Sequence, residues 1–225
     1  MYNDRMVDAG FEIRRCESCG LRYPIPVGHP LGTRCPVCMG ETRLLLHRPL
    51  VTEPARAARW KASPGTKCSR AVILDNIRSA WNVGSILRSA DGFGFTHAYL
   101  CGITPTPDNE AVTKTSLGAE NAVPWSYHKD AVRLSKGLKR EGWAVYALEE
   151  GGQANPITAM RGKQHDWALI VGNELSGVDP ELLELCDEVV CIPMRGEKKS
   201  FNVSVAFGIA AFALDDYEDD EKTQK

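Results

Sequence analysis

The feature that most constrains this fold is an alternation of apolar runs and helical patterns between residues 71 and 214. The run AVIL at residues 71–74 is continuously apolar, which is typical of a strand covered on both faces. Apolar residues at helical spacing follow it, at Val83, Ile86, Leu87 and Ala90. Alternating strands and helices predict an α/β fold with a parallel sheet.

The same patterns predict the remaining elements of this region, and no internal repeat is apparent. Further strands are expected at His97–Cys101, Trp143–Leu148, Trp167–Val171 and Glu188–Ile192. Further helices are expected at Asn109–Leu117, Asp130–Arg140, Pro180–Leu185 and Val203–Leu214.

The last expected helix, residues 203–214, has almost no polar face. A helix that is apolar all round must be buried on every side. In a small domain a second subunit can supply part of that cover. The sequence therefore predicts a homodimer formed through the C-terminal helix.

Four of the eight cysteines form two pairs, Cys16-x-x-Cys19 and Cys35-x-x-Cys38, with fifteen residues between them. This spacing is typical of a zinc ribbon, in which four thiolates hold one structural Zn²⁺. A module of about 50 residues buries little core, so metal binding would supply most of its folding energy, on the order of 10 kcal/mol. A coincidental pair of turns or a redox site is the alternative. The other four cysteines lack this spacing and are expected to be ordinary core residues.

Residues 1–48 would form this ribbon, with segments 21–27 and 42–46 able to supply strands. Its basic face consists of Arg14, Arg15, Arg22, Arg34, Arg43 and Arg48. This face favours an RNA-binding accessory domain, and a structural cap or a protein-docking module is the alternative. Residues 49–67 contain several prolines and are expected to be a linker, within which residues 55–61 could form a short basic helix.

The net charge of −2 does not by itself indicate a nucleic-acid binder, so an RNA surface must be a local basic patch. Residues 215–225 include six acids and are expected to be a disordered tail. Without those acids the chain would carry a net charge of about +4, which favours RNA. No stretch is long enough to span a membrane, and the N-terminus lacks the apolar core of a signal peptide. A cytoplasmic protein with reduced thiols is expected.

Several catalytic signatures are absent from the sequence. A dinucleotide site needs the pattern G-x-G-x-x-G between a strand and a helix. Gly92-Phe93-Gly94 follows a helix and lacks the third glycine, which argues against such a site. No P-loop pattern occurs. No H-x-E motif accompanies the cysteine pairs, which argues against a zinc deaminase.

Four short blocks combine glycine with polar and charged residues, and the last two of them begin where the strands expected at 167–171 and 188–192 end. They are NVG at 82–84 with Arg88 and DGFG at 91–94, KTSLGAE at 114–120 with VPW at 123–125, GNELSG at 172–177, and IPMRG at 192–196 followed by SFNVSVA at 200–206. Glycines at such positions let backbone groups approach a ligand closely.

In this order, the blocks resemble the motifs of the SpoU-type RNA ribose 2′-O-methyltransferases of the SPOUT superfamily, over residues 72–214. The resemblance implies that residues 68–214 form a parallel α/β domain whose C-terminal part is threaded into a trefoil knot. It also implies S-adenosylmethionine as cofactor, and structured RNA, either tRNA or rRNA, as substrate. The implied cofactor-binding residues are Leu148, Gly172, Ile192, Met194, Gly196, Ser200 and Phe201. Phe201 stands where the family usually has leucine.

The resemblance further implies a catalytic set consisting of Arg88, Asn82, Glu174, Ser200 and Asn202. A guanidinium is too weak an acid to act as a lone base, so Arg88 is expected to clamp the adjoining phosphate and to lower the pKa of the ribose hydroxyl. Asn82 would orient Arg88 or the RNA, and Glu174 would hold one of those two side chains. Ser200 and Asn202 would fix the ribose. The competing hypothesis is a non-catalytic zinc-ribbon RNA-binding protein built on a methyltransferase scaffold.

Overall fold

The computed structural model describes residues 10–49, 68–151, 154–160, 165–198 and 200–215. The chain divides into two compact units, Met1–Lys61 and Ala62–Lys225, and each is described by itself. Apart from Pro49 and Asp215, the expected linker with its short helix and the expected acidic tail lie outside the described residues.

The first unit is a three-stranded antiparallel sheet with strand order β2-β1-β3. The strands are β1 (Gly10–Cys16), β2 (Arg22–Pro26) and β3 (Thr42–Pro49). The strands expected at 21–27 and 42–46 are present. The sequence did not predict β1, although it is the central strand that pairs with both others. The first cysteine pair begins at Cys16, the last residue of β1, and the second pair lies between β2 and β3.

The second unit contains a seven-stranded sheet with strand order β6-β5-β4-β9-β7-β10-β8. All neighbouring strands pair in parallel. The strands are β4 (Arg70–Asp75), β5 (His97–Cys101), β6 (Trp125–His128), β7 (Ala144–Leu148), β8 (Asn155–Pro156), β9 (Trp167–Val171) and β10 (Glu188–Cys191). The prediction of a parallel α/β fold is confirmed, and the expected C-terminal knot stays a prediction. Sequence patterns missed β6 and β8, the two edge strands, which are only four and two residues long.

The helices of this unit begin at side chains that cap their first turns. The α-helices are α1 (Ala80–Gly92), α2 (Glu110–Ser116), α3 (Ala131–Arg140), α4 (Pro180–Leu185) and α5 (Val203–Ala213). Two 3₁₀ helices span Ala119–Asn121 and Ile157–Met160. The capping side chains, each accepting a backbone N–H, are Ser79, Asn109, Asp130, Asp179 and Asn202. None of the described helices has the length and apolar composition needed to cross a bilayer.

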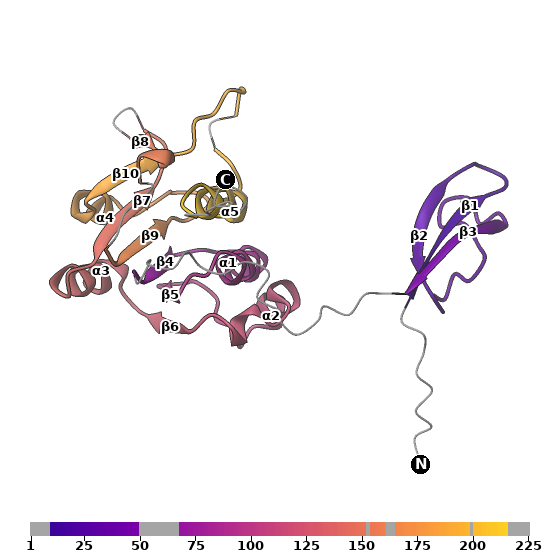
Figure 1. Ribbon diagram of the computed structural model, residues 1–225, viewed down its shortest axis with the longest axis horizontal. Helices are drawn as coiled ribbons and strands as arrows, with labels where there is room; N and C mark the ends of the chain where they lie inside the picture. The colour runs from indigo at the N-terminus through magenta and orange to yellow at the C-terminus, as the bar shows by residue number, and fades with distance from the viewer. Residues whose placement is uncertain (1–9, 50–67, 152–153, 161–164, 199, 216–225) are drawn as a thin grey trace, which may run out of the picture. The chain divides into compact units, whose positions relative to one another are not determined.

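Helices cover both faces of the sheet, with α1 and α5 on one face and α3 and α4 on the other (Figure 1). Val72 and Leu74 of β4 belong to the apolar core under α1 and α5, whereas Ala71 and Ile73 belong to the core under α3 and α4. Successive strand residues point to opposite faces, so a strand covered twice must be apolar throughout. This explains the continuous apolar run at residues 71–74.

Within one chain, α5 is buried on one side only. Phe207 and Ala210 lie in the core, but Val205 is 49% exposed and Phe212 is 69% exposed. The expectation that this helix is buried on every side is therefore not met by the single chain. An apolar face of α5 remains at the surface.

Candidate functional site

A cavity of about 510 Å³ opens at the edge of the sheet where β7, β9 and β10 end. Because these strands are parallel, their carboxyl ends meet at one edge of the sheet, where open α/β sheets place their ligands. The walls include Leu148 at the end of β7, Gly172 after β9 and Ile192 after β10. The segment 200–203, which leads into α5, closes another side. This volume is in the range of small-molecule sites.

The loop after β9 is folded back tightly on itself. Asn173 and Gly177 exchange two backbone hydrogen bonds of 2.9 Å each. A Cβ atom on Gly172 would lie 2.3 Å from both the carbonyl carbon of Gly177 and the nitrogen of Val178, so position 172 has no room for a side chain. Gly177 itself has a φ of +73°, in the region that favours glycine. The two glycines of this block therefore determine the shape of the cavity wall.

Glu174, on this loop, accepts three hydrogen bonds through its carboxylate. The donors are the backbone N–H groups of Arg78 at 2.9 Å and Ser79 at 3.0 Å, and the Nδ2 atom of Asn82 at 2.9 Å. Partial burial opposes ionisation, but the hydrogen bonds from Arg78, Asn82 and Ser79 outweigh it and lower the pKa of Glu174 below its ordinary value. The carboxylate is thus charged at neutral pH and ties the β9 loop to the start of α1.

The hydrogen bonding continues from Asn82 to the start of α5. Asn202 Nδ2 donates to Asn82 Oδ1 at 3.2 Å. Asn202 Oδ1 in turn accepts from the backbone N–H of Ser204 at 3.0 Å and from its hydroxyl at 2.7 Å. The structure therefore joins Glu174, Asn82 and Asn202, three residues from separate sequence blocks, in one hydrogen-bonded chain beside the cavity.

Arg88 is not part of this row of hydrogen-bonded side chains. It lies on α1 six residues after Asn82, which places it about 240° around the helix and about 9 Å along it. Its side chain is exposed and does not line the cavity. It makes no hydrogen bond or ion pair with the residues that the structure describes. Glu174 thus holds Asn82 rather than Arg88.

Five of the seven residues expected to bind the cofactor line the cavity, namely Leu148, Gly172, Ile192, Ser200 and Phe201. Met194 and Gly196 lie farther along the loop after β10 and are not among the lining residues.

The sequence patterns missed Glu149 and Glu150, which also line the cavity, and gave no role to Asn173 of the 172–177 block, which does so too. Glu149 Oε2 accepts the backbone N–H of Val178 at 2.9 Å, so it ties the end of β7 to the β9 loop. The position of Glu149 directly after an expected strand was the available signal.

The first unit brings the four paired cysteines together. Their Sγ atoms all lie within 4.8 Å of one another, with Cys16 and Cys38 at 3.4 Å and Cys19 and Cys35 at 3.7 Å. Zinc–sulfur bonds of about 2.3 Å in a tetrahedron require sulfur–sulfur distances of about 3.8 Å. The cluster therefore has the dimensions of a Zn²⁺ site. Of the other four cysteines, Cys101 is fully buried, whereas Cys68, Cys186 and Cys191 are half-buried.

The thiols of Cys16 and Cys19 do not ionise alike. The backbone N–H of Cys19 favours the thiolate of Cys16 and lowers its pKa to about 6, although burial opposes this. At Cys19 the backbone of Leu21 also favours the thiolate, but the neighbouring sulfurs of Cys38 and Cys16 outweigh it and raise the pKa to about 12. One ionised sulfur thus opposes ionisation of the next. A cation among the sulfurs would remove this conflict.

Comparison with known proteins identifies relatives of the second unit. Residues 69–212 match the model of the SpoU rRNA Methylase family. The 23S rRNA (guanosine-2′-O-)-methyltransferase RlmB of Xanthomonas axonopodis pv. citri is 34% identical over 142 residues, which cover 63% of this chain and 56% of that protein. The protein of the same name from Salmonella typhi is 34% identical over 143 residues, covering 63% and 57%. The chain spans little more than half the length of these relatives.

Solved structures show the same fold. The A. aeolicus TrmH/SpoU tRNA modifying enzyme is 28% identical with a TM-score of 0.58, and the match covers 67% of this chain and 76% of that one. The AdoMet-bound rRNA methyltransferase from Sinorhizobium meliloti is 25% identical with a TM-score of 0.58, covering 65% and 55%.

Proposed function

The chain belongs to the SpoU rRNA methylase family, and we propose that it is an S-adenosylmethionine-dependent methyltransferase acting on a ribose 2′-hydroxyl of RNA. The observation that carries this proposal is the cavity at the ends of β7, β9 and β10, with the hydrogen-bonded chain of Glu174, Asn82 and Asn202 beside it. The names of the RlmB relatives, which are guanosine-2′-O-methyltransferases, support it.

The cavity suits the proposed cofactor. S-adenosylmethionine, when bound, would supply a methyl group carried on a sulfonium. The wall around Gly172 offers backbone close to the cavity because position 172 has no room for a side chain. Leu148 and Ile192 add apolar surface, and Ser200 and Phe201 lie in the segment opposite. Glu149, Glu150 and Glu174 make the lining acidic, which suits a ligand with a cationic sulfonium. Met194 and Gly196 stay candidates in the loop after β10.

The acceptor side of the reaction needs the ribose to be positioned and its hydroxyl proton to be released. The side-chain amide nitrogen of Asn82 donates to Glu174, and its amide oxygen accepts from Asn202. These two hydrogen bonds fix the orientation of the Asn82 amide beside the cavity. Ser200 and Asn202 would hold the ribose. Arg88 would clamp the adjoining phosphate and lower the pKa of the hydroxyl. Its guanidinium has no partner among the described residues, which leaves it available for a phosphate.

The substrate we propose is structured RNA. The RlmB relatives are named for 23S rRNA, and one structural relative is titled a tRNA modifying enzyme. We further propose that Cys16, Cys19, Cys35 and Cys38 hold a structural Zn²⁺ and that the surrounding residues 1–48 form an accessory RNA-binding domain. A reducing compartment such as the cytoplasm would keep these thiols available to the metal.

We also propose a homodimer formed through α5. This helix leaves Val205 and Phe212 exposed although both are apolar. A second copy of the chain would cover this surface through a two-fold interface.

Two measurements test the activity. Calorimetry should detect binding of S-adenosylmethionine by the purified chain, and methyl groups from labelled cofactor should appear at ribose 2′-positions of RNA taken from cells that lack the protein. Cofactor binding without methyl transfer would favour the non-catalytic RNA-binding alternative. Failure to bind the cofactor at all would refute the proposed function.

Arg88→Ala tests the role of the guanidinium. We expect methyl transfer to fall at least a hundredfold, because loss of a charged clamp at a reacting centre costs roughly 3 kcal/mol or more. Cofactor affinity should stay within about twofold because Arg88 does not line the cavity. A loss of cofactor binding in this variant would mean that Arg88 has a different role.

A further inference from the structure

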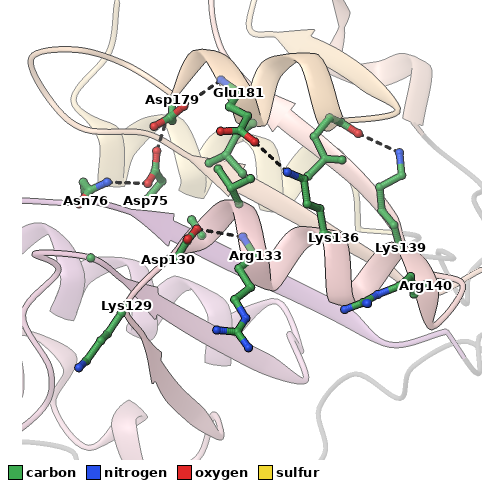
Figure 2. Close-up of a pocket in the computed structure, with 15 residues that line it drawn as sticks. Asp75, Asn76, Lys129, Asp130, Arg133, Lys136, Lys139, Arg140, Asp179 and Glu181 are labelled. Carbon is green, nitrogen blue, oxygen red and sulfur yellow. Dashed lines mark hydrogen bonds and ion pairs between the residues drawn. The ribbon is translucent and has the colours of Figure 1, made fainter.

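A second cavity, of about 1090 Å³, lies on the opposite face of the sheet, between α3 and α4 (Figure 2). It reaches the carboxyl edge of the sheet at Asp75, Asn76 and Gly102. The backbone carbonyl of Asn76 accepts a hydrogen bond of 2.6 Å from the side-chain amide of Asn173, which lines the first cavity. One hydrogen bond therefore links the walls of the two cavities, between the loops that follow β4 and β9.

Five basic side chains line this second cavity, and two of them are tied to neighbouring elements. Lys136 forms an ion pair with Glu181 of α4 at 2.8 Å. Lys139 pairs with Asp187 at 2.7 Å and also donates to the backbone carbonyl of Leu185 at 2.8 Å. These contacts hold α3 against α4, so both lysines have a structural role.

The other three basic residues are Lys129, Arg133 and Arg140. All three are exposed, and none makes a side-chain hydrogen bond or an ion pair within the described parts of the chain. Arg133 and Arg140 are seven residues apart on α3, which places them on the same side of the helix, about 10 Å apart along its axis. Figure 2 shows Lys129 and Arg133 extending away from Glu181, whereas Lys136 reaches toward it. We call these three residues, of which Lys129 lies two residues before α3, the α3 basic stripe.

Among the described residues, the acids of this cavity form no ion pair with the stripe and accept hydrogen bonds from other groups. Asp130 accepts the backbone N–H of Arg133 at 2.9 Å, and Asp179 accepts that of Glu181 at 2.8 Å. Asp75 accepts from Asn76 Nδ2 at 2.8 Å and from the backbone N–H of Asp179 at 3.1 Å. The three exposed cations therefore have no ion-pair partner within the described ranges, which leaves their charges available for a phosphate.

We propose that the α3 basic stripe binds the phosphate backbone of the RNA substrate. Lysine and arginine contacts to phosphates position a nucleic acid without reading its sequence. An RNA strand held at α3 would lie along a cavity whose wall is hydrogen-bonded, through Asn76 and Asn173, to the wall of the candidate active site. This inference rests on the proposed RNA methyltransferase activity and adds a binding surface to it, on the face of the sheet opposite α1 and α5.

The test is the salt dependence of RNA binding by the full chain. Fluorescence anisotropy with a short labelled single-stranded RNA gives the affinity at a series of KCl concentrations. Each phosphate contact on a single strand contributes about 0.7 to the slope of log affinity against log salt. The variant with Lys129→Gln, Arg133→Gln and Arg140→Gln should therefore lower that slope by about 2.

The matched control is the double variant with Lys136→Gln and Glu181→Gln. It removes a cation from the same helix together with its acidic partner, so the net charge is unchanged and the stripe is intact. We expect its salt slope to equal that of the wild type. An equal loss of slope in both variants would overturn the proposal, because helix integrity rather than the three free cations would then explain the loss.

Calorimetry with S-adenosylmethionine on the same proteins distinguishes the two proposals. Unchanged cofactor binding in the triple variant, together with its reduced slope, supports the stripe. A wild type that does not bind the cofactor overturns the proposed function. If the triple variant keeps the wild-type salt slope, the proposal that the stripe binds RNA is overturned. An acidic protein surface would then be the remaining candidate partner for these cations.

Discussion

At the scale of single residues, the side chains beside the candidate active site are fixed by one carboxylate. Glu174 receives three hydrogen bonds, of which two come from the backbone at the start of α1 and one comes from Asn82. Asn82 passes this constraint to Asn202 at the start of α5. The orientation of both amides therefore depends on the ionised form of Glu174.

Glu174→Gln should lower the free energy of unfolding at pH 7 by about 1 kcal/mol, since partial exposure lets water replace part of the lost hydrogen bonding. The pKa of Glu174 is lowered in the folded state, so its stabilising effect is present above pH 4.5, the ordinary value for glutamate, and is lost as the pH falls through the folded-state pKa. The difference in free energy of unfolding between the wild type and the variant should therefore shrink below pH 4.5.

Urea denaturation at pH 7 and at several acidic pH values measures this difference. Glu184→Gln, on the exposed side of α4, is the control and should change stability little at any of them. If the difference in free energy of unfolding between the wild type and Glu174→Gln stayed constant down to pH 3, the assigned role of the carboxylate would be contradicted.

At the scale of elements, Gly172 and Gly177 determine the conformation of the loop after β9, because neither position tolerates a side chain without strain. Gly172→Ala would place a Cβ 2.3 Å from backbone atoms of Gly177 and Val178, and backbone cannot move aside as a flexible side chain can. The loop must shift, at a cost of about 1–3 kcal/mol. We expect cofactor affinity to fall at least tenfold, as measured by calorimetry.

Gly151→Ala is the matched control, because a Cβ there meets nothing within 4 Å. It should bind the cofactor as the wild type does. Equal affinity of Gly172→Ala and wild type would show that the proposed cofactor does not contact this loop.

The N-terminal sheet is an element whose small core needs support from its cysteine cluster. The full chain should contain about one zinc ion, measured by mass spectrometry of the metal content. Cys16→Ser should lose the metal and unfold this sheet, because metal binding supplies much of the folding energy of such modules. Cys186→Ser, which changes a half-buried thiol outside the cluster, should keep it. A wild-type protein purified without chelators and free of metal would contradict the assignment.

At the scale of the whole molecule, the exposed apolar face of α5 predicts the oligomeric state. Light scattering at micromolar concentration should give twice the chain mass of 24.7 kDa. Val205→Glu with Phe212→Glu should give the single-chain mass, because two charges cannot be buried in an apolar interface without partners. Ile103→Glu, which alters an equally exposed apolar residue in the loop after β5, should remain dimeric. A monomeric wild type would rule out the α5 interface.

The sequence alone determined the α/β architecture, the helix boundaries near their caps and the cysteine cluster. These features are local, because each depends on apolar periodicity, a capping side chain or a fixed spacing of ligands. The family resemblance, carried by blocks such as those at 82–84 and 172–177, is confirmed by the family match over residues 69–212. The short edge strands β6 and β8 left too few residues for a pattern to register.

Only the tertiary structure decided which of the predicted residues meet. Glu174, Asn82 and Asn202 are up to 120 residues apart in sequence, and the order of strands in the sheet brings them together. The same folding left Arg88 outside this hydrogen-bonded chain and gave Lys136 and Lys139 acidic partners, whereas Lys129, Arg133 and Arg140 have none among the residues described. Hydrogen bonds and ion pairs need distances near 3 Å, and such distances between remote residues are set by packing of the whole unit rather than by any local pattern.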